Sequence, residues 1–229
     1  MLTSLISGRE VLSPEDLSCD AAETICITGH REKSIEPYRD ERIYASMTVS
    51  AVKLMLYRFI DMAAEHGYKN FINGLAVGTD LWAAEYILEK KKHSPGLRLI
   101  GAMPYLRHAE HFPAYYKELL NKVENGADAL ISVSSDPNAF YSKTAAGKYL
   151  YRDRNYFMVD HSSAVIAFHN KGSAFSGTSQ TVNYACRKGV RVCRFGIDDV
   201  YRMIDSCGTD IRKIKRGITF LENEFDLPY

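Results

Sequence analysis

The sequence Asn73-Gly74-Leu75-Ala76-Val77-Gly78-Thr79-Asp80-Leu81-Trp82-Ala83-Ala84-Glu85 sets a turn of small residues between a short apolar run and an amphipathic run. Glycine lets a ligand approach the backbone closely, and the helix that follows directs its unpaired amides and its dipole at the turn. The stretch therefore predicts a strand, a glycine turn and a helix whose N-terminus holds an anionic group. A phosphate-bearing molecule is the ligand that it favours.

Outside this stretch, short apolar runs alternate with longer helical patterns, as in a parallel sheet covered by helices on both faces. We predict a Rossmann-like, three-layer α/β/α fold with a mainly parallel sheet of about six strands. The predicted strands are residues 24–28, 69–72, 98–103, 129–133, 164–168 and 191–195. Helices are predicted between the first two strands and at residues 79–92, 108–125, 150–161 and 178–188.

The composition is that of an ordinary globular chain, with 229 residues, of which 46% are hydrophobic and 25% charged. We expect an N-terminal tail at residues 1–22 and a single domain at 23–229, with one or two covering helices at 199–224. No apolar run approaches the roughly 20 residues needed to cross a bilayer, so a cytoplasmic protein without a membrane partner is expected. The net charge of +1 argues against strong non-specific binding of nucleic acid.

Ligands of open parallel sheets lie at the carboxyl ends of the strands, so the loops that follow strands matter most. Four such loops are polar or rich in glycine, and we expect them to converge in one cleft. They begin at Gly29, Gly74, Pro104 and Asn170.

In the second loop, Gly74 and Gly78 permit a tight turn, and Ala76 lies between them. Thr79 and Asp80 are good candidates for the N-cap of the following helix, where a cap contributes about 1 kcal/mol. An ordinary capped turn is the alternative to a phosphate loop. Asp80 and Glu85 are the candidate catalytic carboxylates, although Asp80 also suits a ribose hydroxyl and Glu85 a structural or solvated position.

In the fourth loop, the run Ser176-Gly177-Thr178-Ser179 opens a helix and presents three hydroxyl groups beside its exposed amides. The same residues would also serve as ordinary caps. The chain has neither the Gly-x-Gly-x-x-Gly nor the Gly-x-x-x-x-Gly-Lys-Ser/Thr pattern, so the standard dinucleotide and nucleoside-triphosphate hydrolase sites are not predicted.

The first loop, Thr28-Gly29-His30-Arg31, adds a cationic group directly after the first strand. Arginine grips phosphate through two parallel hydrogen bonds, which makes Arg31 a phosphate candidate. His30 is either an acid or base near neutral pH or a hydrogen-bonded structural group. The pair His108 and His111 has a spacing that suits a metal, but no third ligand accompanies it, and we predict neither a metal site nor a cofactor.

The pair Arg154 and Asn155 precedes the apolar face of an amphipathic helix. It is either part of the ligand site or part of an exposed charged face whose ion pairs contribute a few tenths of a kcal/mol each.

Three of these segments, taken in order, resemble the Rossmann-like core of the DNA-processing protein DprA (Smf). They are Gly74-Leu75-Ala76-Val77-Gly78-Thr79-Asp80, then Arg154-Asn155 with Asp160-His161-Ser162-Ser163, and then Ser176-Gly177-Thr178-Ser179-Gln180-Thr181. Thr28-Gly29-His30-Arg31 with Leu81-Trp82-Ala83-Ala84-Glu85 is similar to the YpsA-type, largely uncharacterised bacterial relatives in the SLOG superfamily, which also contains the LOG phosphoribohydrolases.

This resemblance implies a SLOG fold whose loops bind a nucleotide, a nucleotide-derived molecule or, in DprA-like members, single-stranded DNA. The LOG enzymes carry a catalytic glutamate in their Gly-Gly-x-Gly-Thr-x-x-Glu element, and Thr181 stands at that position here. Binding of a nucleotide or nucleotide-derived small molecule is therefore the leading prediction. Hydrolysis of an N-glycosidic or phosphoribosyl bond, binding of single-stranded DNA near Arg152 and Arg154, and formation of a homodimer remain open alternatives.

Overall fold

The computed structural model describes residues 2–35, 45–140, 145–170, 176–208, 210 and 212–215, without the side chains of residues 45–46 and 145–148. Parts of two predicted segments lie outside these ranges. They are residues 171–175 of the fourth loop, and residues 209, 211 and 216–224 of the expected covering helices.

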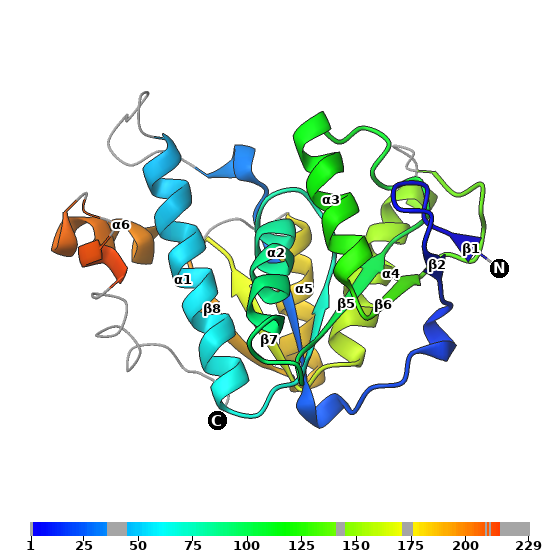
Figure 1. The fold of residues 1–229 in the computed structure, drawn as a ribbon, viewed down its shortest axis with the longest axis horizontal. Helices are drawn as coiled ribbons and strands as arrows, with labels where there is room; N and C mark the ends of the chain where they lie inside the picture. The colour runs from blue at the N-terminus through cyan, green and yellow to red at the C-terminus, as the bar shows by residue number, and fades with distance from the viewer. Residues whose placement is uncertain are drawn as a thin grey trace.

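Six parallel strands form the central sheet in the order β6-β5-β4-β3-β7-β8 (Figure 1). Their bounds are β3 (Thr24–Gly29), β4 (Asn70–Asn73), β5 (Arg98–Met103), β6 (Ala129–Ser132), β7 (Ala164–Phe168) and β8 (Arg191–Phe195). The predicted fold class is confirmed, and each predicted strand agrees with an observed one to within a residue at either end. Apolar runs bounded by turns located these strands because both faces of a parallel sheet are buried.

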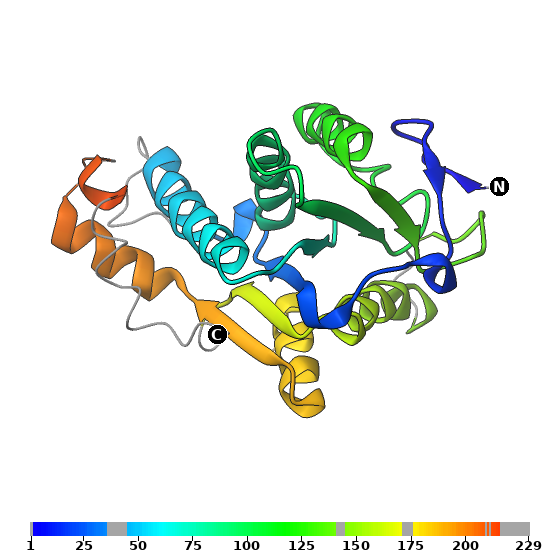
Figure 2. The same ribbon diagram turned by 60° about the horizontal axis from the view of Figure 1, so that its bottom comes forward.

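Helices cover both faces of the sheet (Figure 2). The chain forms α1 (Ala45–Glu65), α2 (Thr79–Lys91), α3 (Ala114–Gly126), α4 (Ala145–Asp160), α5 (Gly177–Lys188) and α6 (Ile197–Cys207), with short 3-10 turns η1 (Pro14–Asp16), η2 (Ala21–Glu23) and η3 (Glu32–Ser34). Because side chains alternate along a strand, Ile25 and Ile27 pack in the core beneath α1, α2, α3 and α6, whereas Cys26 packs in the core beneath α4 and α5.

The third helix begins six residues later than the sequence predicted. Residues 105–112 form turns, and α3 starts at Ala114 after Pro113, which takes an extended backbone at ψ 151°. Proline disfavours helical geometry in the residue before it, so the helical spacing of apolar residues ahead of Pro113 did not produce a helix. This difference leaves Tyr105 and His108 in a loop at the carboxyl end of β5.

The N-terminal residues, expected as a tail, form an antiparallel pair of short strands, β1 (Leu2–Thr3) and β2 (Glu10–Val11). Leu12 bridges to Ile131, so this segment lies along the outer edge of β6. Arg9 also donates to the carbonyl of Ala127, at 2.6 Å, just beyond the end of α3. Covering the edge of β6 removes a row of unpaired backbone groups.

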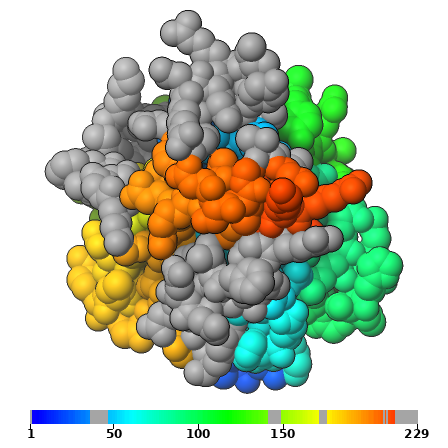
Figure 3. Space-filling view, turned by 90° about the vertical axis from the view of Figure 1, so that its left-hand side faces the viewer, coloured from blue at the N-terminus to red at the C-terminus, as the bar shows by residue number. Residues whose placement is uncertain are grey.

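At the opposite end of the molecule, α6 packs against α1 and lies across the surface (Figure 3). No helix within the described residues combines the length and the apolar character that crossing a membrane requires.

Candidate functional site

The order of the strands places a topological switch point at the carboxyl end of β3, and we call the region between the loops at this point the crevice. The chain moves outward from β3 through β4, β5 and β6, and then crosses to β7 on the other side of β3. Loops at such a switch point diverge to opposite faces of the sheet, and ligands of open α/β folds bind there. The first, second and fourth predicted loops, which follow β3, β4 and β7, surround this crevice.

Direct hydrogen bonds join these three loops. Thr79 Oγ1 donates to the carbonyl of His30 at 2.7 Å, which links the loop after β4 to the loop after β3. The amide of Asn170 donates to His30 Nε2 at 3.0 Å, which links the loop after β7. His30 is buried, and burial, followed by the nearby His169, lowers its pKa below the usual value. His30 therefore acts as a neutral structural bridge between the loops, while Thr28 lies buried at the end of β3.

Two glycines keep these loops close together. A Cβ on Gly29 would lie 2.7 Å from Thr79 Oγ1, and a Cβ on Gly78 would lie 2.6 Å from the backbone nitrogen of Glu32. Gly78 also has φ +90°, in the region that side chains disfavour. Larger residues at either position would separate the loop after β3 from the loop after β4.

A glycine is required at position 74 for a different reason from the one that the sequence suggested. The φ of Gly74 is not positive. The next residue, Leu75, has a φ of 56°, and it is the one described residue other than glycine with a positive φ. Asn73 supports that conformation, since its Oδ1 accepts from the Leu75 amide at 2.8 Å and its Nδ2 donates to the Asp80 carbonyl at 2.7 Å. Gly74 instead provides space, because a Cβ there would overlap Arg154 Nη1 and lie 2.6 Å from Asp80 Oδ2.

Arg154 is a buried member of the site. It extends from α4, donates from Nη1 to the carbonyl of Gly74, and lies 3.7 Å from Asp80 Oδ2. The side chains of Arg154 and Asp80 are each only 7% exposed. The reading of Arg154 as part of an exposed charged face is therefore wrong, and a surface for single-stranded DNA would have to use Arg152 and neighbouring tyrosines without it.

Asp80 is the buried carboxylate of this crevice. Burial raises its pKa to about 6, although Arg154, the amide of Ala76 at 3.4 Å and Arg31 all favour the charged form. Arg31 is exposed, yet it also contributes to lowering the pKa of Arg154, for which burial is the main cause. Arg154 contacts the Asp80 carboxylate directly, and the charge of Arg31 also favours its ionised form.

His108 is a neighbour of Arg154 that the sequence considered only for metal binding. Its Nδ1 lies 3.2 Å from the carbonyl of Tyr105, and burial, followed by Arg154, lowers its pKa to about 4. Among the described residues, neither His108 Nε2 nor Arg154 Nε has a hydrogen-bond partner. Buried polar atoms without partners are rare and often mark functional regions. The position of this histidine at the carboxyl end of β5 was the signal that could have identified it.

The N-termini of α2 and α5 differ in their described contacts. The N-cap of α2 is Gly78, without a side-chain cap, so the prediction of Thr79 or Asp80 as N-cap is wrong. In α2, the amide of Thr79 donates to His30 O at 3.4 Å and the amide of Leu81 donates to Ala76 O at 3.2 Å, so the helix closes on its own loops. In α5, Ser176 caps the helix by accepting from the Ser179 amide at 3.0 Å, and Gly177 is exposed. Thr178 and Ser179 are buried behind them.

Two further residues define the surroundings of α5. Asn155 Nδ2 donates to the carbonyl of Gly177 at 3.4 Å, which connects α4 to this turn. Thr181 is fully buried, and its hydroxyl donates to the same carbonyl at 2.9 Å. Thr181, the position that the motif resemblance matches to the glutamate of the LOG enzymes, therefore carries a hydroxyl group that is bonded to its own helix.

Glu85, the second candidate carboxylate, forms its described ion pair outside the crevice. It pairs with Lys122 of α3 at 2.9 Å, and its side chain is 32% exposed. None of its described hydrogen bonds or ion pairs joins it to Asp80 or Arg154. The structure brings together Gly74, Ala76, Asp80 and Arg154, and leaves Glu85 on the side of α2 that faces α3.

Comparison with known proteins identifies the family. A model of the YpsA family, described as the YspA SLOG family, matches residues 25–199. YoqJ, an SPbeta prophage-derived protein of Bacillus subtilis (strain 168), is 33% identical over 124 residues, which are 53% of this chain and 71% of YoqJ. The UPF0398 protein SH1465 of Staphylococcus haemolyticus (strain JCSC1435) is 22% identical over 149 residues, 65% of this chain and 74% of that protein.

Among solved structures, DNA processing protein A (DprA) from Streptococcus pneumoniae superposes with a TM-score of 0.46 and 17% sequence identity. The match covers 90% of this chain and spans 62% of the DprA chain. The family match covers more than half of the sequence, so this chain belongs to the YpsA SLOG family, and the resemblance noted from its motifs is confirmed.

Proposed function

We propose that this member of the YpsA SLOG family binds a nucleotide or a nucleotide-derived small molecule in the crevice between β3, β4 and β7. The ligand's phosphate would lie between the N-terminus of α5, where Gly177 is exposed, and the exposed guanidinium group of Arg31. Asp80 and Asn155 would orient the sugar.

The observation that carries this proposal is the buried pair of Arg154 and Asp80, at 3.7 Å, with the exposed cation Arg31 on the adjoining loop after β3. Arg154 is fixed by the carbonyl of Gly74, whereas Arg31 is exposed and able to contact a ligand. Arginine binds phosphate through two parallel hydrogen bonds, and a second guanidinium group nearby favours an anion at the same place.

The N-terminus of α5 supplies the second support. Gly177 is exposed, and a Cβ added there would meet only Asn155 Nδ2, at 3.8 Å. The first amides of a helix and its dipole favour a phosphate at this point. Asn155 would adjust the position of the sugar, because its amide already lies against the turn.

Calorimetry and thermal denaturation with nucleoside monophosphates and dinucleotides test this proposal. A ligand present at about 100 times its dissociation constant stabilises the folded protein by about 2.7 kcal/mol. Arg31→Gln should weaken binding about tenfold, since a charged hydrogen bond is lost. Lys33→Gln, another exposed cation close to Arg31 in the chain, is the matched control and should leave the affinity unchanged. The proposal is wrong if no such compound binds, or if the two variants behave alike.

Asp80 gives a specific reason to consider hydrolysis as a second function. A buried carboxyl whose pKa is about 6 can exchange protons near neutral pH, as a general acid or base must. An N-glycosidic or phosphoribosyl bond is the bond that it would act on. Nucleoside monophosphates incubated with the protein should then release free base, and Asp80→Asn should abolish release while Glu85→Gln should not. Chromatography that detects no free base from any of these substrates would exclude this second function.

A further inference from the structure

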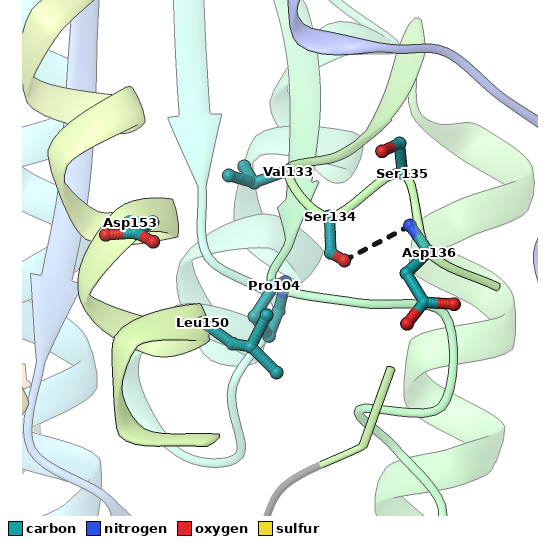
Figure 4. A pocket seen from close by; sticks show the side chains of 7 residues that line it. All are labelled: Pro104, Val133, Ser134, Ser135, Asp136, Leu150 and Asp153. Carbon is teal, nitrogen blue, oxygen red and sulfur yellow. Dashed lines mark hydrogen bonds between the residues drawn. The ribbon is translucent and has the colours of Figure 1, made fainter. Parts of the chain in front are cut away.

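A separate cavity of about 250 Å³ lies at the carboxyl ends of β5 and β6, beside α4 (Figure 4). It has three apolar residues, Pro104, Val133 and Leu150. Its polar residues are two serines and two aspartates: Ser134, Ser135, Asp136 and Asp153. None of the contacts described for the phosphate crevice involves these side chains.

The size and charge of the cavity restrict what it can bind. Pockets for whole drug-sized ligands have volumes of roughly 300–1,000 Å³, so this cavity suits a fragment of such a ligand. Among the described residues that line it, two are carboxylates and none is a cation, which disfavours a phosphate. The apolar side chains suit the faces of a flat ring, and the carboxylate oxygens suit N–H donors at its edge.

Helix α4 connects this cavity to the phosphate crevice. Leu150, Asp153 and Arg154 are spaced i, i+3 and i+4, so they lie on neighbouring parts of one helical face. Leu150 and Asp153 line the cavity, whereas Arg154 reaches the carbonyl of Gly74 about one turn, or 5.4 Å, further along.

The same helix also reaches the proposed phosphate position. Asn155, two residues after Asp153, donates from Nδ2 to the carbonyl of Gly177 at the N-terminus of α5, at 3.4 Å. Two residues of a helix span about 3 Å along its axis, so neighbouring parts of α4 line the cavity and contact the N-terminus of α5. A sugar would lie between the two.

We propose that this cavity binds the base of the nucleotide whose phosphate occupies the crevice, and that it selects bases bearing an exocyclic amino group. This inference rests on the proposed function and adds the class of base.

The hydrogen bonds already present define how an amino-bearing base is recognised. Arg152 donates to Asp153 Oδ1 at 2.9 and 2.7 Å, and Oδ2 of the same carboxylate accepts from the amino group. Ser134 Oγ accepts from the Asp136 amide at 3.3 Å, and its own O–H donates to a ring nitrogen. A base with a carbonyl in place of the amino group would bring an acceptor against the Asp153 carboxylate and would be rejected.

The test compares adenosine monophosphate with ribose 5-phosphate by calorimetry. Ribose 5-phosphate carries the phosphate and sugar without a base, so the wild-type protein should bind adenosine monophosphate at least tenfold more tightly. Leu150→Trp fills the cavity from its half-buried wall and should remove this difference while leaving ribose 5-phosphate binding unchanged. Tyr149→Trp, on the adjacent and exposed residue, should change neither affinity.

Selectivity is tested with inosine monophosphate, in which a carbonyl replaces the amino group of adenine. The wild-type protein should prefer adenosine monophosphate about tenfold or more, and Asp153→Asn should abolish the preference. If ribose 5-phosphate and adenosine monophosphate bind equally, or Leu150→Trp weakens both to the same degree, the base site is wrong while the phosphate site stands. If neither compound binds, the proposed function itself fails, and the base site fails with it.

Discussion

Replacing Gly74 by alanine tests whether the space above this residue, rather than the flexibility of its backbone, holds the site together. The new Cβ would overlap Arg154 Nη1 and lie 2.6 Å from Asp80 Oδ2. Arg154 would have to withdraw, which breaks its hydrogen bond to the Gly74 carbonyl and separates it from Asp80. Because both side chains are buried, water cannot readily replace these contacts.

The cost follows from the interactions that would be lost. A hydrogen bond to a charged group contributes about 1.5–3 kcal/mol, and breaking a buried charge pair costs about 3–5 kcal/mol when one partner is left behind. Arg154 can keep part of its interaction by bending, so we expect Gly74→Ala to lower the free energy of unfolding by about 3 kcal/mol. For a chain of this length that corresponds to a fall in Tm of about 6–12 °C.

Urea denaturation at constant pH measures this change, with Gly177→Ala as the control. A Cβ on Gly177 would meet only Asn155 Nδ2, at an ordinary 3.8 Å, and alanine in a first helical turn costs little or stabilises. In a Gly74→Ala/Arg154→Gln double variant, the two changes should cost less than the sum of the single ones, since the same contact is removed twice. Equal stability of Gly74→Ala and Gly177→Ala, or full additivity in the double variant, would refute the assignment.

Three further outcomes are expected. Gly78→Ala should destabilise the protein by about 2 kcal/mol more than Gly67→Ala in thermal unfolding. Both glycines have φ near +90°, but a Cβ on Gly78 would lie 2.6 Å from the backbone nitrogen of Glu32, whereas a Cβ on Gly67 would meet no atom within 4 Å. Similar losses in the two variants would contradict the close packing of the loops. The raised pKa of Asp80 stabilises the folded protein below about pH 4, and this contribution is lost as the pH rises through about 6. Between pH 4 and 7, the free energy of unfolding of the wild type should therefore fall by about 2–3 kcal/mol relative to that of Asp80→Asn in denaturant titrations. Parallel pH curves for the two proteins would show that the pKa is normal. Arg9→Ala should remove the contacts to the end of α3 and speed proteolysis within residues 2–12 under native conditions, and an unchanged cleavage rate would show that these contacts do not hold the segment.

Local sequence patterns were enough to predict the strands and the positions of the loops that follow them. Each buried strand is a short apolar run, and parallel strands bring the loops at their carboxyl ends to one edge, so the proximity of the loops at Gly29, Gly78 and Asn170 followed from order alone. The loop at Pro104 was expected in the same cleft, and it lines the separate cavity instead. The start of α3 was predicted too early because the apolar spacing before Pro113 was weighed above the proline. The contacts between distant loops required the structure.

The sequence left two interpretations of Arg154 open, and burial of its side chain excludes the exposed charged face. Its neighbours in sequence are charged, and a charged turn of an amphipathic helix is usually solvated. Nothing in that local pattern reports that Gly74, 80 residues earlier, leaves room for a guanidinium group. The space at Gly74 and the position of Arg154 depend on each other, so the sequence around either residue could not explain it.

The balance between binding and catalysis depends on where carboxylates lie around the crevice. At α5, the position equivalent to the glutamate of the LOG enzymes is Thr181, which is fully buried and bonded to the Gly177 carbonyl. A carboxylate at Thr181 would lack both solvent and that bond, so Thr181→Glu would destabilise the helix rather than restore an acid. On the opposite wall, Asp80 is held by Arg154 and the Ala76 amide in a geometry that a sugar hydroxyl would share rather than displace. These two positions therefore support the proposed ligand binding more than the proposed hydrolysis.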